Sequence, residues 1–201
     1  MAYASWVSPN KQSGSGNDTV AWTGQTHTGR SPRTTTATFS ASGVESKVLT
    51  INQAGKSEFV EMDDTATIAK TGGTVTISGT SNSPKLTFAL TGTDNIGLTL
   101  PSVYIANSVN TNNGAAIAGD PGATQQYAFS ITFTNVGANT SVSSLVSQLT
   151  VTTDNGTTDT CTITQAAGDA TLSISPTTIN LTAAGTAVNV TVTSNTSWTI
   201  S

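Results

Sequence analysis

The 201-residue sequence has few of the side chains on which enzymes and metal proteins depend. It contains one cysteine, Cys161, and one histidine, His27, which excludes an intrachain disulfide bond and a metal site built from several His and Cys ligands. The motifs G-x-x-x-x-G-K-[ST], H-E-x-x-H and G-x-S-x-G do not occur, although each marks a well-defined chemistry. We therefore expect a protein that is not an enzyme, with no catalytic residue, no metal and no cofactor.

Charged residues are also scarce: they make up 9% of the chain, and seven Lys and Arg against eleven Asp and Glu give a net charge of −4. The basic residues are scattered, so they form no surface suited to nucleic acid. No stretch approaches the roughly 18 consecutive apolar residues that a membrane-spanning helix needs. The N-terminal sequence has neither the basic segment nor the apolar core of a secretory signal. We expect a protein that stays in the cytosol in which it is made, or one whose leader has been removed.

Threonine is the most abundant residue. The chain contains 41 Thr, 24 Ser and 15 Asn, together 80 of its 201 residues, and 18 Gly. The β-branched side chain of Thr favours strands, whereas Gly, Asn and Ser favour the turns between them. The composition therefore predicts strands joined by turns rather than helices.

Two segments of the sequence recur at nearly the same spacing. Residues 48–55 resemble residues 160–167, which lie 112 positions later, and residues 72–83 resemble residues 185–196, which lie 113 positions later. A repeating unit therefore ends near Gly55 and the next extends to about Gly168. A third unit begins directly afterwards.

Apolar and polar residues alternate within each unit, which predicts half-buried strands. The sequence Asp154-Asn-Gly156 between two alternating runs predicts a hairpin with a type I′ turn. No stretch shows helical periodicity, so the predicted fold class is all-β, with immunoglobulin-like antiparallel β-sandwiches. The residues expected in the core of the middle unit are Val75, Ile77, Phe88, Leu149, Val151 and Ile163.

The two ends of the chain have the patterns of complementary parts of one domain. Residues 1–55 match the back half of a sandwich, residues 56–168 a complete sandwich with an inserted loop at about 91–125, and residues 169–201 a front half. We predict that the front half completes the back half around Trp6 and Trp198, because an incomplete sandwich exposes sheet edges and apolar surface.

This completion can occur in two ways. Within one chain it requires the linkers 53–57 and 165–171 to lie at the same end of the middle unit. Between neighbouring chains it allows opposite ends and closes into a ring or extends into a filament. We favour completion within one chain, which needs no particular protein concentration. A truncated array of repeats is the alternative to both.

Four short segments carry a family resemblance: Ser194-Asn-Thr-Ser-Trp198, Ser5-Trp-Val-Ser-Pro9, Gly14-Ser-Gly-Asn17 and Gln53-Ala-Gly55. They resemble BACON domains, which are immunoglobulin-like sandwiches common in gut bacteria and in the phages that infect them. The resemblance covers residues 1–55 and 169–201 well and the middle unit more loosely, where Pro84-Lys85 replaces the Trp of the motif. It implies an immunoglobulin-like fold and raises carbohydrate binding, for which the family was named.

Few residues are candidates for contact with a ligand or partner. Trp22 alternates with Val20 and suits the core and a sugar-stacking surface equally well. The segment 107–125 has the turn content of an exposed loop, so we take Asn112, Asn113 and Asp120 as candidate contacts. A buried Trp is usual in such sandwiches, so Trp6 and Trp198 are expected as core anchors. The other expected core anchors are Val75, Val151 and Ile163.

Three further groups have a functional and a structural interpretation. Asp63-Asp64 and Asp94-Asn95 offer oxygen ligands for calcium, but neither lies in a calcium-loop motif, and we expect ordinary turns. Arg30 and Arg33 could pair with an acidic partner, and we favour a solvated loop. Cys161 alternates with Ile163, which predicts a small core residue.

Three functions fit these observations. The first is a structural protein of a phage particle, such as an auxiliary capsid, decoration or head-fibre subunit, assembled in the host cytoplasm. Its partners would be the major capsid protein, other virion proteins or further copies of itself. The second is a carbohydrate-binding module of a secreted or surface bacterial protein that binds host or mucosal glycans. The third is a spacer in a larger enzyme. We favour the first because repeated sandwiches without catalytic groups suit docking.

Overall fold

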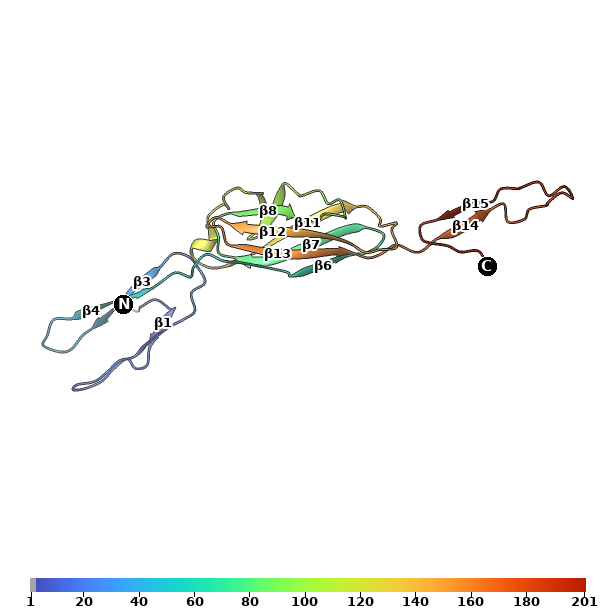
Figure 1. Cartoon of the computed structure of the whole chain (residues 1–201). Helices are drawn as coiled ribbons and strands as arrows, with labels where there is room; N and C mark the ends of the chain where they lie inside the picture. Colours follow the sequence, from blue (N-terminus) through green and yellow to red (C-terminus); the bar gives the residue numbers. More distant parts are fainter. Residues whose placement is uncertain (1–2) are drawn as a thin grey trace.

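The computed structural model describes residues 3–201 and contains fifteen strands and one short 3₁₀ helix within that range. The expected all-β fold of antiparallel sheets is confirmed. Among the described residues no helix is long and apolar enough to cross a membrane. The chain divides into an N-terminal half-sandwich (residues 3–55), a middle sandwich (residues 56–168) and a C-terminal arm (residues 169–201), which follow one another in Figure 1.

The middle sandwich consists of two sheets. Its elements are β5 (Val60–Met62), β6 (Thr65–Ile68), β7 (Gly73–Ser81), β8 (Leu86–Thr91), β9 (Val103–Ala106), β10 (Val109–Asn112), η1 (Pro121–Ala123), β11 (Tyr127–Val136), β12 (Leu145–Thr153) and β13 (Thr158–Gln165). One sheet has the order β10-β9-β11-β7-β5 and the other the order β6-β13-β12-β8. The pairs are antiparallel except for β6 with β13, which is parallel and aligns Ala66 with Ile163.

Alternating apolar residues from both sheets form the core. All six residues predicted to point inward are buried: Val75, Ile77, Phe88, Leu149, Val151 and Ile163. The ring of Phe88 lies 4.9 Å from that of Tyr104 and 5.7 Å from that of Phe129. Cys161 is also buried, and its burial raises the pKa of the thiol to about 11. The thiol is therefore neutral at physiological pH and acts as a small core residue.

The hairpin predicted between β12 and β13 is present, but its turn differs from the predicted type. Thr152 pairs with Thr158 across a loop that contains Asp154, Asn155 and Gly156. Only Gly156 of these three has a positive φ, of 90°, whereas a type I′ turn needs two such residues. Thr153 N also donates to Thr157 O (2.8 Å), so the loop has three residues, one more than a type I′ turn connects. Three-residue hairpin loops combine a type I turn with one left-handed glycine, which explains the difference.

The segment predicted as an inserted loop is partly a sheet. β9 and β10 form a hairpin within it, and β9 pairs with β11. Tyr104 and Ala106 are buried in the core, whereas Val103 and Ile105 between them are exposed. The alternation of these four apolar residues therefore supports a strand with two faces rather than a loop.

The two end segments of the chain contain only two-stranded sheets. In the N-terminal half-sandwich β1 (Val7–Pro9) pairs with β2 (Trp22–Gly24), and β3 (Arg33–Phe39) pairs with β4 (Lys47–Gln53). In the arm β14 (Leu172–Ser175) pairs with β15 (Thr191–Ser194). Each of these strands therefore has at least one edge without a partner strand among the described residues.

The end segments attach to opposite ends of the middle sandwich, as Figure 1 shows. β7 connects these ends. Asn82, next to its last residue, donates a hydrogen bond to Thr28 O of the N-terminal half-sandwich (3.1 Å). Before its first residue, Lys70 forms an ion pair with Asp169 at the start of the arm (2.6 Å). The expectation that one chain completes its own split domain is therefore wrong, because the arm extends away from the half that it was expected to cover.

Replacement of a core valine tests the packing of the middle sandwich. Val151→Ala removes two methyl groups from a fully buried site and should lower the free energy of unfolding by about 2 kcal/mol. Val109→Ala makes the same change at a valine that is 49% exposed and should cost less than about 0.5 kcal/mol. Urea denaturation followed by circular dichroism measures both values. Equal losses would contradict the assigned core.

Two buried tyrosines provide a second test. The Tyr104 hydroxyl is the one buried side-chain polar atom of the described chain that lacks a hydrogen-bond partner, so Tyr104→Phe should leave stability unchanged or raise it by about 1 kcal/mol. The Tyr127 hydroxyl donates to Ser83 O (2.8 Å), so Tyr127→Phe should cost about 1–2 kcal/mol. Thermal unfolding of both variants shows the difference. A larger loss for Tyr104→Phe would refute this assignment.

Candidate functional site

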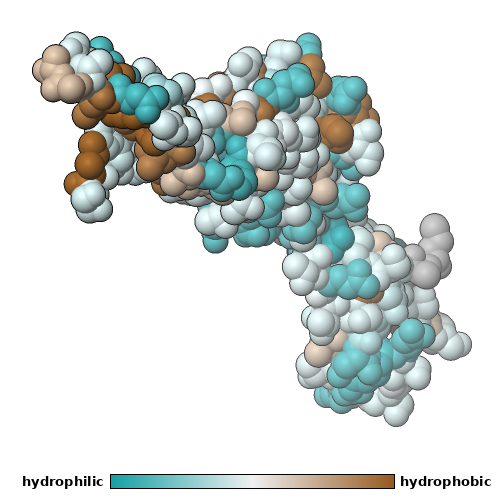
Figure 2. Space-filling view, turned by 90° about the vertical axis from the view of Figure 1, so that its right-hand side faces the viewer, coloured by the Kyte–Doolittle hydropathy of each residue, from teal (hydrophilic) through white to brown (hydrophobic). Residues whose placement is uncertain are grey.

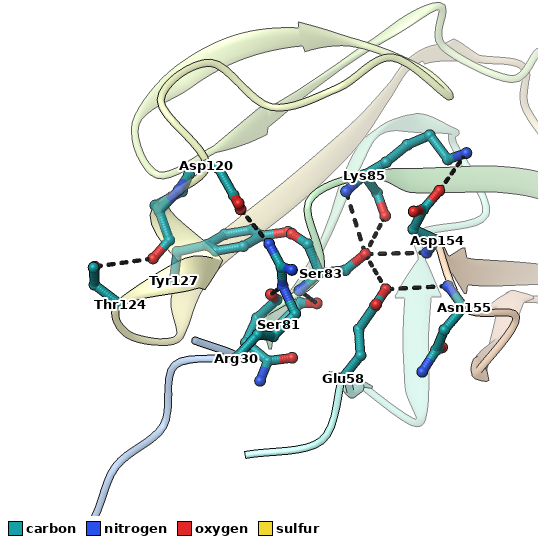
Figure 3. A network of polar contacts seen from close by, with 12 residues as sticks. Arg30, Glu58, Ser81, Ser83, Lys85, Asp120, Thr124, Tyr127, Asp154 and Asn155 are labelled. Carbon is teal, nitrogen blue, oxygen red and sulfur yellow. Dashed lines mark hydrogen bonds and ion pairs between the residues drawn. The ribbon is translucent and has the colours of Figure 1, made fainter. Parts of the chain in front are cut away.

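A polar network lies where the N-terminal half-sandwich meets the middle sandwich (Figure 3). Arg30, in the loop between β2 and β3, reaches across this junction. Its Nε donates to Asn82 O (2.5 Å), and its Nη2 pairs with the Asp120 carboxylate (2.5 Å). The backbone N–H of Arg30 also donates to Gly122 O (2.9 Å). The arginine therefore ties the loop between β2 and β3 to the 3₁₀ turn of the middle sandwich by side chain and backbone together.

Ser83 organises the second part of this network. Its hydroxyl donates to Glu58 Oε1 (2.6 Å) and accepts hydrogen bonds from the N–H groups of Lys85 (3.2 Å) and Asp154 (3.1 Å). Lys85 Nζ forms an ion pair with Asp154 Oδ1 (2.7 Å). The Tyr127 hydroxyl joins the network by donating to Ser83 O (2.8 Å), and burial raises the pKa of this phenol. These groups satisfy one another, which leaves a rigid junction and no free nucleophile–base pair.

Asn82 is the central residue of the junction. It is fully buried, and its amide donates to Thr28 O (3.1 Å) and Ser57 O (3.2 Å). Its Oδ1 accepts a hydrogen bond from Phe59 N (2.9 Å). One side chain thus holds together the linker, the residue that precedes β5 and the preceding half-sandwich. Gly122 packs so closely here that a Cβ atom would lie 2.0 Å from Asn82 O.

The contacts of Asn82 recur where the middle sandwich meets the arm, 112 or 113 residues later in sequence. Asn195 corresponds to Asn82: its amide donates to Thr140 O (3.0 Å) and Asp169 O (2.9 Å), and its Oδ1 accepts from Thr171 N (2.8 Å). Each of these partners is the counterpart of a partner of Asn82. The repeat seen in the sequence is therefore also a repeat of the junction geometry.

Further contacts repeat with the same spacing. Gln53 Nε2 donates to Gln25 O (2.8 Å), and its counterpart Gln165 Nε2 donates to Gly137 O (2.7 Å). Ser81 Oγ donates to Phe59 O (2.6 Å), and its counterpart Ser194 Oγ donates to Thr171 O (2.8 Å). Successive units are thus joined in one way, as expected for a head-to-tail array.

A hollow of about 670 Å³ opens on the N-terminal half-sandwich. Trp22 lines it, and the ring of Tyr3 meets that of Trp22 edge-on at 5.1 Å. Gln12 Nε2 donates to the Tyr3 hydroxyl (3.1 Å), and Lys11 pairs with Asp18 (2.5 Å). The hydrogen bond from Lys11 lowers the pKa of the Asp18 carboxyl. The structure thus brings together aromatic, amide and carboxylate groups that are not adjacent in sequence.

The candidate contact residues have different roles. Asn112 is exposed, but Asn113 is used internally: its Nδ2 donates to Phe88 O (2.9 Å), and its Oδ1 accepts from Phe88 N (2.7 Å). Asp120 is bound to Arg30 within the chain. Trp22 lines the hollow. Asn112 ends strand β10, and Asn113 and Asp120 lie outside the strands of the middle sandwich. Asn113 and Asp120 thus have intrachain partners while they remain partly exposed, and contact of the segment 107–125 with a ligand or partner stays a prediction.

The two expected tryptophan anchors are not core residues of the single chain. Trp198 is 47% exposed, since the arm carries only one pair of strands to cover it. Trp6 is half-buried, and the guanidinium of Arg33 lies 4.5 Å from its ring centroid. Arg33 also donates to Gln53 Oε1 (2.9 Å). The arginine pairs within the chain rather than with a partner.

Two of the candidate calcium ligands, Asp94 and Asp63, accept hydrogen bonds from within the chain. The Asp94 carboxylate accepts from the N–H groups of Gly97 (3.0 Å) and Leu98 (3.1 Å) and from Ser147 Oγ. Asp63 Oδ2 accepts from Ser78 N (2.8 Å). Within residues 3–201 no three His, Cys, Asp or Glu side chains lie close enough together to hold a metal ion.

The sequence analysis named Arg30 and Asp120 without their pairing, and it missed the role of Asn82 at the junction. Asn82 and Asn195 share the sequence Ser-Asn-Ser/Thr, which signals the repeat but not the buried position of the amide. The pairing of Arg30 with Asp120 spans 90 positions, and no local pattern indicates it.

Comparison of the chain with known protein families and with curated proteins gives no match.

The buried amide of Asn82 provides a test of the junction. Asn82→Asp replaces a donor to two carbonyls by a carboxylate facing them, which should lower the free energy of unfolding by about 3 kcal/mol. Asn195→Asp makes the same change at an exposed residue and should cost less than about 1 kcal/mol. Chemical denaturation in dilute solution measures both. Equal losses would contradict the central role of Asn82.

Proposed function

We propose that the protein is a non-enzymatic structural subunit of a bacteriophage particle, which docks through its immunoglobulin-like units. One observation supports this most: a complete sandwich carries an incomplete sandwich at each end (Figure 1). Unpaired sheet edges are sites at which other strands add. The resemblance to domains found in gut bacteria and their phages suggests the particle. The expected partners are the major capsid protein, other virion proteins and further copies of the chain.

The chemistry of the junction supports a mechanical role. Buried hydrogen bonds and ion pairs of Arg30, Asn82 and Ser83 connect one unit to the next. Such charge-assisted and multiply bonded contacts fix geometry. A subunit that has to hold a defined spacing between docking ends needs this kind of rigid connection.

Carbohydrate binding is the second candidate, and the hollow of the N-terminal half-sandwich is the observation that favours it. Trp22 and Tyr3 offer aromatic faces beside the Asp18 carboxylate and the Gln12 amide. Such a mixture of aromatic and polar groups suits a sugar ring. In this case the chain would be a binding module at a bacterial cell surface.

The composition of purified particles tests the first proposal. Phage particles banded in a caesium chloride gradient, from a culture that carries the gene, should contain the chain in a constant ratio to the major capsid protein. Mass spectrometry measures this ratio. A chain found only in the fractions outside the particles would contradict the proposal.

A glycan array separates the second candidate from the first. A binding module should retain one class of glycan and lose it in Trp22→Ala, whereas Trp198→Ala in the arm should not change binding. The structural proposal predicts no selective retention of any glycan by the full chain.

A further inference from the structure

We infer that the C-terminal arm of one copy completes the N-terminal half-sandwich of a second copy by adding the strands that this half lacks. The inference deepens the proposed function, on which it rests, by naming the partner of both open ends. The middle sandwich provides the template, because it contains the same strands fully assembled.

The N-terminal half-sandwich corresponds to the second part of the middle sandwich. β3 and β4 pair in the register of β12 and β13: Arg33 aligns with Gln53 as Leu145 aligns with Gln165. At the spacing of 112 residues β2 corresponds to residues 134–136, the end of β11 that pairs with β7. Residues 3–55 contain no counterpart of β5, β6 or β7 among their strands. The free edges of β2 and β4 therefore correspond to edges that are paired in the middle sandwich.

The arm corresponds to the first part of the middle sandwich. β14 pairs with β15 as β5 pairs with β7: Leu172 aligns with Ser194 as Val60 aligns with Ser81. The following segment 178–181 matches β6, at a spacing of 113 residues. The arm thus carries counterparts of β5, β6 and β7, which are the strands absent from the N-terminal half-sandwich.

Side-chain burial shows that the arm lacks a second sheet to cover its apolar residues. The apolar residues of the arm are exposed at positions whose counterparts form the core of the middle sandwich: Leu172 is 62% exposed against 6% for Val60, and Leu181 is 64% exposed against 4% for Ile68. Figure 2 shows these hydrophobic side chains gathered on the arm, which projects at the upper left. Residues 170–201 contain no charged side chain, although charges are the usual protection of an exposed edge strand.

The N-terminal half-sandwich shows the complementary deficit. Phe39 is 46% exposed, whereas its counterpart Val151 is fully buried. The hollow lies between the two small sheets, with Trp22 of β2 on one side and Ala37 and Phe39 of β3 on the other. Apolar strands of a second copy would fill it.

The template predicts the register of the contact. Ile163 of β13 aligns with Ala66 of β6 in parallel, so Ile51 of one copy should align with Ile179 of the next, and Asn52 with Asn180. Because the junctions at Asn82 and Asn195 are alike, each added copy continues the same head-to-tail geometry. The product is a filament, or a ring if the rotation closes.

Cysteine cross-linking tests this register with full-length chains. One chain carries Asn52→Cys and the other Asn180→Cys, and the mixture is oxidised and separated without reductant. We expect a covalent dimer only in the mixture, because the paired Cα atoms lie within the range of a disulfide bond. Asn52→Cys mixed with Thr182→Cys is out of register by two residues and should give no dimer. The parent chain controls for Cys161, which is buried.

Sedimentation of the full chain tests the apolar contact. Assembly should grow with concentration and should be lost in Ile179→Lys, whereas Thr177→Lys adds the same charge to the same arm and should assemble like the parent. An unchanged unfolding transition of the middle sandwich shows that both variants are folded.

Three results would overturn the inference: a single-chain mass at all concentrations, no dimer in the in-register mixture, or a dimer of Asn180→Cys chains alone, which would mean that arms pair with arms. These outcomes are independent of particle composition. A chain that assembles in this way but is absent from phage particles would refute the proposed function alone. A chain that is present in particles but stays single in solution would refute the inference alone.

Discussion

Pairing of backbone N–H and C=O groups along strand edges is the constraint on which this structure depends. A strand inside a sheet satisfies both edges, whereas a strand at an edge leaves a row of donors and acceptors free. The middle sandwich has nine strands in two sheets, so only its outer strands β10, β5, β6 and β8 keep one unpaired edge, and each sheet buries one apolar face. The same strand types at the two chain ends lack their partners, so they combine exposed apolar side chains with free edges.

The contacts that join successive units repeat along the chain. Asn82 and Asn195 each hold three backbone groups from segments on both sides of a linker. At Asn82, which is fully buried, the loss of one bond would leave a buried polar group unsatisfied. Asn195 makes matching bonds at an exposed position. Rigid junctions and open ends together favour assembly into a regular array over binding in many orientations.

The sequence predicted the parts of the fold that depend on local patterns. Alternation identified the core faces of β7 and β12, and the spacing of the Gln-Ala motifs identified the repeat that β4 and β13 share. The turn at Gly156 was predicted with the wrong type, because loop length rather than the Asn-Gly pair decides it. β9 was missed because its four apolar residues lie between turn sequences. The junction was missed because Arg30, Asn82 and Asp120 meet only in the folded chain.

The central claim is that β4 (Lys47–Gln53) has a free edge in one copy and a paired edge in the assembly. Amide hydrogen exchange of the full chain at low and high protein concentration measures this directly, since pairing slows the exchange of edge amides. The account predicts that protection of β4 and of residues 178–181 rises together with concentration, while the amides of β12 and β13 in the middle sandwich do not change. Exchange of β4 that is fast and independent of concentration would contradict it.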